Sequence, residues 1–168
     1  MMPIIISAIS LIFDGIFSNF LPYMKNDLSF FTPLLTVSSL FLLYPFYRKT
    51  PKRYYLHAFL LGIIYDLFYT NLLFFDGILF LGVALLSKIL YKNLEVHSFS
   101  LIFHISLIII FYESFTAFLL FFFHLVPITI SFLIYKIIHS LLLNIIYIEI
   151  IYFLLKLIPK RYKKISIN

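Results

Sequence analysis

Long apolar runs separated by short polar segments make up nearly the whole chain. A membrane-crossing helix needs about 20 mostly apolar residues, and the first such run extends from Pro3 to Pro22. The apolar region 54–91 is too long for one crossing, so we divide it near residues 71–77, where turn-forming residues occur. The expected helices are 3–22, 30–47, 54–72, 75–91, 98–123 and 129–158.

These runs favour helices over strands. A transmembrane barrel is built from segments of about 10 residues that alternate apolar and polar positions, whereas these runs are apolar on every side. The composition agrees, with 63% hydrophobic and 12% charged residues against about 45–50% and 25% in a soluble domain. The sequence therefore predicts an all-α integral membrane protein, a six-transmembrane-helix bundle forming one domain over residues 1–168.

The basic residues predict the orientation of the bundle. Lys and Arg in short loops mark the cytoplasmic side. If the N-terminus is cytoplasmic, the segments 48–53 and 88–97 and the C-terminal tail together hold eleven of the thirteen Lys and Arg, and the outer loops hold only Lys25. We therefore expect both termini in the cytoplasm, and we expect anionic lipids, rather than nucleic acid, at the basic loops.

The sequence lacks the residue patterns of common catalytic and metal sites. The absence of cysteine excludes disulfides, thiol catalysis and thiolate metal centres. The chain has no H-E-x-x-H motif, no glycine-framed serine and no glycine-rich phosphate loop, and its histidines lack the spacing of a helical zinc pair. We therefore expect no enzyme activity and no cofactor or metal.

Ionisable residues inside the expected helices are the main functional signal, because each costs a few kcal/mol at bilayer depth unless it is partnered. Asp14 and Asp66 fall near the membrane midplane, and Glu113 lies at a similar depth in the fifth helix. Lys136 lies within reach of Glu113 if the fifth and sixth helices are neighbours. The sequence thus predicts an intramembrane ion pair and a buried acid at Asp14.

The small and polar residues of the third helix share one face. Its members are Ala58, Gly62, Tyr65, Asp66, Tyr69 and Thr70. One interpretation is a packing seam or pocket wall for a partner, with Asp66 at its centre. The other is an aspartate that is protonated or hydrogen-bonded to Tyr65 or Tyr69 and only holds the bundle together. Asn144 lies on a comparable polar face of the sixth helix.

The stretch from His57 to Thr70 resembles the third-helix signature of the rod shape-determining protein MreD family, in which a glycine is followed four residues later by an aspartate and then by a threonine. Asp14-Gly15, Glu113 and Leu143-Asn144 with the basic tail support the resemblance. Length, number of spans and orientation also fit this family.

The resemblance implies a non-catalytic subunit of the bacterial cell-elongation complex, acting in cell shape and peptidoglycan synthesis. Members of the family bind the single-span scaffold MreC, and through it connect to MreB filaments and to RodA with its transpeptidase. It also implies a bundle similar to the substrate-binding subunits of energy-coupling-factor transporters. The alternative function is therefore a vitamin-binding subunit, with Asp66, Asn144 and neighbouring tyrosines lining a ligand cavity.

Overall fold

The computed structural model describes residues 2–20, 33–70, 72–93, 98–124 and 129–157. The expected all-α class is confirmed over these residues, which contain helices and turns and no strand. The elements are α1 (Met2–Phe20), α2 (Leu35–Tyr47), α3 (Pro51–Tyr65), the π-helical turn η2 (Asp66–Thr70), α4 (Phe75–Asn93), α5 (Ser98–Phe122) and α6 (Ile130–Leu157).

The third helix begins earlier than expected. The helix α3 begins at Pro51, three residues earlier than expected, because proline lacks the N–H that the first helical position leaves unbonded. The helix α4 begins at Phe75, as expected, so Asp76 and Gly77 lie in its first turn and the turn itself ends before Phe75. The expected second helix started at residue 30, but residues 30–32 lie outside the described part of the chain, and the observed α2 begins at Leu35.

Three helices of the described chain are long and apolar enough to cross a membrane. These segments are Met2–Asn19, Ser100–Phe122 and Ile130–Lys156. By the same criteria α2 is too short, because its 13 residues extend only about 20 Å. The chain accordingly has the character of a membrane protein.

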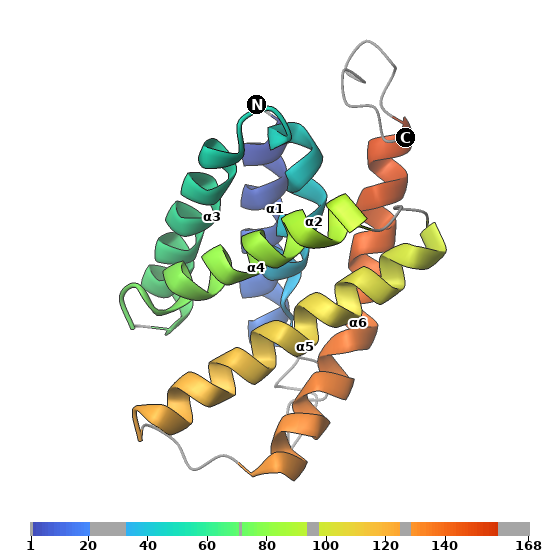
Figure 1. The fold of residues 1–168 in the computed structure, drawn as a ribbon. Helices are drawn as coiled ribbons and strands as arrows, with labels where there is room; N and C mark the ends of the chain where they lie inside the picture. Colours follow the sequence, from blue (N-terminus) through green and yellow to red (C-terminus); the bar gives the residue numbers. More distant parts are fainter. Residues whose placement is uncertain (1, 21–32, 71, 94–97, 125–128, 158–168) are drawn as a thin grey trace.

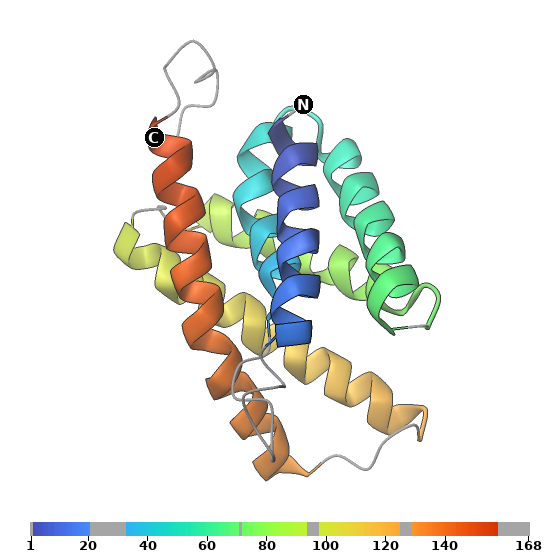
Figure 2. The ribbon, with the colours of Figure 1, turned by 180° about the vertical axis from the view of Figure 1, so that it is seen from behind.

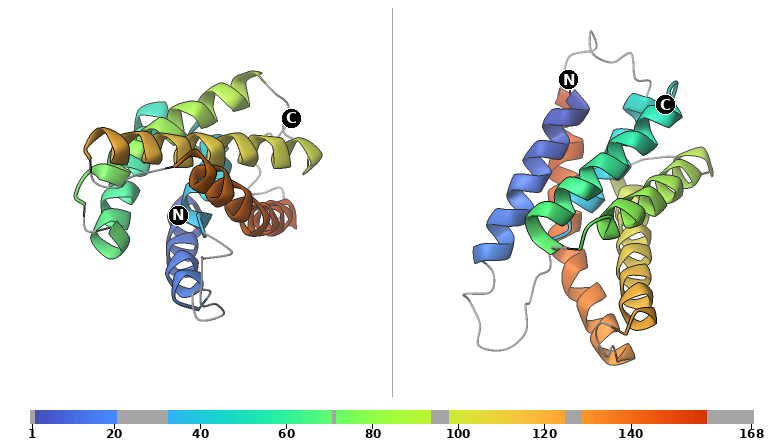
Figure 3. Two further views of the ribbon diagram at one scale, coloured as in Figure 1. Left: turned by 90° about the horizontal axis from the view of Figure 1, so that it is seen from below. Right: turned by 90° about the vertical axis from the view of Figure 1, so that its left-hand side faces the viewer.

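The short helix α2 lies at the centre of the bundle. It contacts α1, α3, α4, α5 and α6, and every residue from Pro33 to Leu43 is buried. In the view of Figure 1 the helices α3, α1 and α2 stand in this order from left to right, while α4 and α5 cross the group obliquely (Figure 1; Figure 3, left). Seen from behind, α1 covers one side of α2 and α6 stands beside it (Figure 2). The start of α1 and the end of α6 face the same side of the molecule (Figures 1 and 2).

Polar side chains are concentrated inside the bundle, and large apolar side chains cover much of its outside. The buried polar and charged residues include Asp14, Asp66, Asp76, Glu113 and Asn144. On the outside, Ile4, Phe68 and Phe122 are each more than 60% exposed. This distribution suits a chain surrounded by lipid, in which polar groups must find their partners within the protein.

Candidate functional site

Asp14 caps the N-terminus of α2 from the neighbouring helix α1. Its Oδ1 accepts a hydrogen bond from the backbone N–H of Leu35 at 2.7 Å, and its Oδ2 accepts one from Thr36 at 2.8 Å. The first N–H groups of a helix have no partner within the helix, and its N-terminus carries partial positive charge. The buried carboxylate therefore meets both needs of α2, which has no side-chain cap of its own at Leu34.

Asn144 completes the same cap from α6. Its Oδ1 accepts a hydrogen bond from the backbone N–H of Leu34 at 3.0 Å and a longer one from the Ser38 hydroxyl at 3.4 Å. Its Nδ2 donates to the Ser140 carbonyl of its own helix at 2.6 Å. The start of α2 is thus bound by one side chain from α1 and one from α6.

Asp66 performs the same task for α4. Its Oδ1 accepts hydrogen bonds from the backbone N–H of Asp76 at 2.9 Å and from the Thr70 hydroxyl at 2.8 Å, and its Oδ2 accepts a longer one from Gly77 at 3.4 Å. These partners differ from Tyr65 and Tyr69, which one of the two interpretations of the sequence named as hydrogen-bond partners of Asp66. Because Phe74 directly before α4 has a positive φ of 69°, the carboxylate holds the helix immediately after a strained turn.

The Ala58–Gly62 step of the third-helix face is an internal packing seam. Both residues are buried, and α3 packs along α4. A Cβ added at Gly62 would lie 2.5 Å from the carbonyl oxygen of Asp76 and 2.6 Å from the Cα of Gly77. Only glycine permits this approach of the two backbones, which brings the N–H groups of α4 to Asp66.

The tyrosines of this face lie at its edge toward α1. Tyr65 is buried, and its ring centroid lies 4.7 Å from that of Tyr69. Tyr69 is 36% exposed, and its hydroxyl donates a hydrogen bond to the Leu11 carbonyl at 2.7 Å. The hydroxyl also covers Gly15, where an added Cβ would lie 2.6 Å away. Tyr69 therefore joins the end of α3 to α1.

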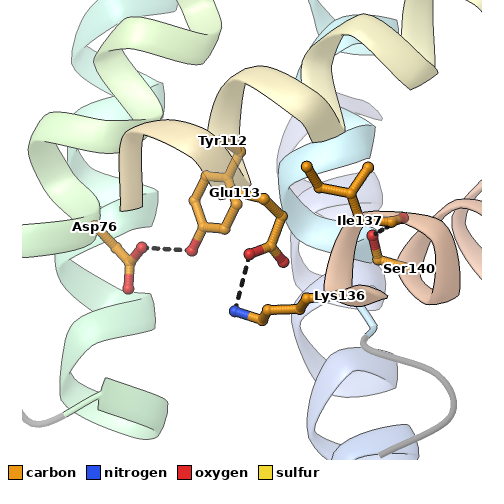
Figure 4. A network of polar contacts seen from close by, with 6 residues as sticks. All are labelled: Asp76, Tyr112, Glu113, Lys136, Ile137 and Ser140. Atoms are coloured by element: carbon orange, nitrogen blue, oxygen red, sulfur yellow. Dashed lines mark hydrogen bonds and ion pairs between the residues drawn. The ribbon is translucent and has the colours of Figure 1, made fainter. Parts of the chain in front are cut away.

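The structure brings the two residues of the expected ion pair together. Lys136 Nζ lies 2.8 Å from Glu113 Oε2 (Figure 4). Glu113 is 1% exposed and Lys136 is 33% exposed, so the lysine approaches the buried acid from the surface of the bundle. The pair links α6 to α5 and compensates two charges that would each be costly alone.

Sequence reasoning missed Asp76 and Tyr112. The Tyr112 hydroxyl donates a hydrogen bond to Asp76 Oδ1 at 2.7 Å, and both residues are buried (Figure 4). Because Tyr112 and Glu113 are adjacent in α5, the polar contacts run from α4 through α5 to α6. An acid in the first turn of a helix is a favourable placement, and the position of Asp76 near the start of the expected helix 75–91 is a signal that the sequence offers for it.

The site has the geometry of a structural clamp. Asp14 and Asn144 bind backbone N–H groups at the start of α2, and Asp66 binds one at the start of α4. Within the described residues, no group of three or more His, Cys, Asp or Glu is placed to hold a metal ion. A groove of about 450 Å³ opens between α4 and α5. Its lining is apolar apart from one hydroxyl: Leu86, Leu107, Ile110, Phe111, Ser114, Phe115 and Phe118.

Comparisons of the chain with protein-family models, with curated proteins and with solved structures give no match. The functional argument therefore depends on the residues themselves and on the contacts that they make.

Proposed function

We propose that the chain is a non-catalytic subunit of the bacterial cell-elongation complex, which holds a single-span scaffold protein similar to MreC in the cytoplasmic membrane. In this proposal the chain crosses the membrane six times with both termini in the cytoplasm. It contributes to cell shape and peptidoglycan synthesis indirectly, because the scaffold connects it to MreB and to RodA with its transpeptidase.

The observation that carries the proposal is the internal use of Asp66. A vitamin-binding subunit would present Asp66 and Asn144 to a ligand cavity, whereas here both side chains cap helices of the bundle. These side-chain caps hold α2 and α4 in fixed positions relative to their neighbours. The outer surfaces of the helices are then rigid, as a subunit that binds another protein requires. The resemblance of residues 57–70 to the MreD signature supplies the identity of the partner.

Purification of the tagged full-length chain from its native membranes in a mild detergent tests the proposal. Mass spectrometry of the eluate should identify a single-span scaffold protein that is absent from a parallel purification of the untagged chain. Recovery of a bound vitamin together with transporter ATPase subunits, in place of the scaffold, would support the transporter alternative and overturn the proposal.

A further inference from the structure

Lys88, near the end of α4, is a half-buried cation that has no acidic partner among the residues that the structure describes. Its Nζ lies 5.8 Å from the centroid of the Tyr55 ring on α3, a distance at which an ammonium group is attracted to an aromatic face. The described part of the chain contains no carboxylate that pairs with Lys88. The aromatic ring lowers the free-energy cost of placing the Lys88 ammonium group between α3 and α4. It carries no net negative charge, however, and so does not neutralise the lysine.

The hydroxyl of Tyr55, whose ring lies below this cation, is also unsatisfied. Its oxygen is buried and has no hydrogen-bond partner within the described part of the chain, although a buried hydroxyl normally finds one because the loss of its hydrogen bonds to water is costly. Lys88 is a donor only, so the two groups share a requirement for an oxygen acceptor that carries negative charge.

The surroundings of Tyr55 and Lys88 are basic. Lys92 lies one turn further along α4, and Lys52 lies one turn before Tyr55 on α3, and both are exposed. No acid occurs in α3 or in α4 after Asp76. Basic pockets between helices at the cytoplasmic side of a membrane protein are typical binding sites for anionic lipid headgroups.

We propose that Tyr55 and Lys88 form a phosphate-binding site between α3 and α4, in which the hydroxyl and the ammonium group donate to the same phosphate. The phosphate belongs to an anionic phospholipid or to free phosphate in solution. This site does not depend on the scaffold partner, so its failure and the failure of the proposed function are separate results.

The purified full-length chain in a zwitterionic detergent is titrated with phosphatidylglycerol and, in a second arm, with inorganic phosphate. Native mass spectrometry measures retained lipid, and the shift of the thermal unfolding midpoint measures binding of either ligand. Tyr55→Phe and Lys88→Gln should each lower the affinity about tenfold, as expected for loss of one hydrogen bond to a charged group. Tyr55→Phe keeps the ring and its packing, so the fold is retained in that variant.

The chain offers a matched control at the end of α6. Lys156 Nζ lies 4.5 Å from the Tyr152 ring centroid, but this lysine is exposed. Lys156→Gln and Tyr152→Phe should leave phosphatidylglycerol binding unchanged. Lipid binding that inorganic phosphate does not compete with identifies the lipid as the source, whereas direct binding of inorganic phosphate identifies the free anion, and either outcome supports the site.

Two results would overturn the site. One is an equal loss of affinity in Lys88→Gln and Lys156→Gln, because it would show attraction by general positive charge. The other is unchanged affinity for both ligands in Tyr55→Phe, because the hydroxyl would then have no part in binding.

Discussion

Glu113 and Lys136 form an ion pair of 2.8 Å between α5 and α6, with the acid fully buried and the lysine partly exposed. Removal of one partner leaves the other charge uncompensated in a low-dielectric interior. We expect Glu113→Gln and Lys136→Met each to lower the free energy of unfolding by about 2 kcal/mol, and the double variant to recover part of the loss. Thermal or denaturant unfolding in detergent measures all four proteins. Strict additivity of the two losses would contradict the pair.

Asp14→Ala should destabilise the bundle more than Asp14→Asn. Alanine removes both acceptors for the N–H groups of Leu35 and Thr36, whereas asparagine keeps one acceptor and is itself a favourable cap. Loss of the cap costs about 1–2 kcal/mol, and amide hydrogen exchange should accelerate first at residues 34–38. Equal protection of these amides in the alanine variant and the unchanged chain would show that α2 does not need Asp14.

Asp66→Ala should weaken recovery of the scaffold partner without reducing the amount of chain in the membrane. Insertion follows hydrophobicity and loop charge, which this change leaves almost intact. The cap on Asp76 and Gly77, by contrast, disappears, and the turn between α3 and α4 loses its anchor. Asp66→Asn is the control, because its side-chain oxygen still accepts the hydrogen bond. Full partner recovery by the alanine variant would make Asp66 dispensable for assembly.

The two helical glycines Gly62 and Gly15 should respond differently to alanine. At Gly62 the added methyl group meets the backbone of α4, which cannot move without separating the helices. At Gly15 it meets the end of the Tyr69 side chain, which has room to rotate at the surface. We expect Gly62→Ala to cost about 1–3 kcal/mol and Gly15→Ala to be close to neutral in thermal unfolding. A neutral Gly62→Ala would contradict the close approach of α3 and α4.

The natural absence of cysteine makes the orientation directly testable. In intact cells, a membrane-impermeant thiol reagent should label Thr129→Cys, at the expected outer end of α6, and should not label Thr50→Cys, between α2 and α3. Both positions are exposed, so permeabilised cells should label both variants and serve as the control. The reverse pattern in intact cells would place the termini outside.

Sequence reasoning reached the helical class because long apolar runs leave few other solutions in lipid. It also singled out Asp14, Asp66 and Asn144, since polar groups are conspicuous in such runs. Their partners could not be predicted, because Asp14 binds an N–H group 21 residues away and Asn144 binds one 110 residues away. Every residue except proline carries the same backbone donor, so the sequence does not mark which helix end a carboxylate will meet. The contact of Asp76 with Tyr112 could not be predicted either, because it joins side chains of two different helices.

The N-terminus of α2 is capped by Asp14 from α1 and by Asn144 from α6, and this has a consequence for the order in which the helices assemble. During synthesis α1 supplies Asp14 before α2 is made, but Asn144 emerges only after α1 to α5 have been translated. Until then the Leu34 N–H lacks its final acceptor, and α2 lacks its packing contacts with α6. The central helix α2 can therefore reach its native environment only after α6 has been made. A chain truncated before α6 would leave α2 without one of its two capping side chains and without the packing contacts of α6.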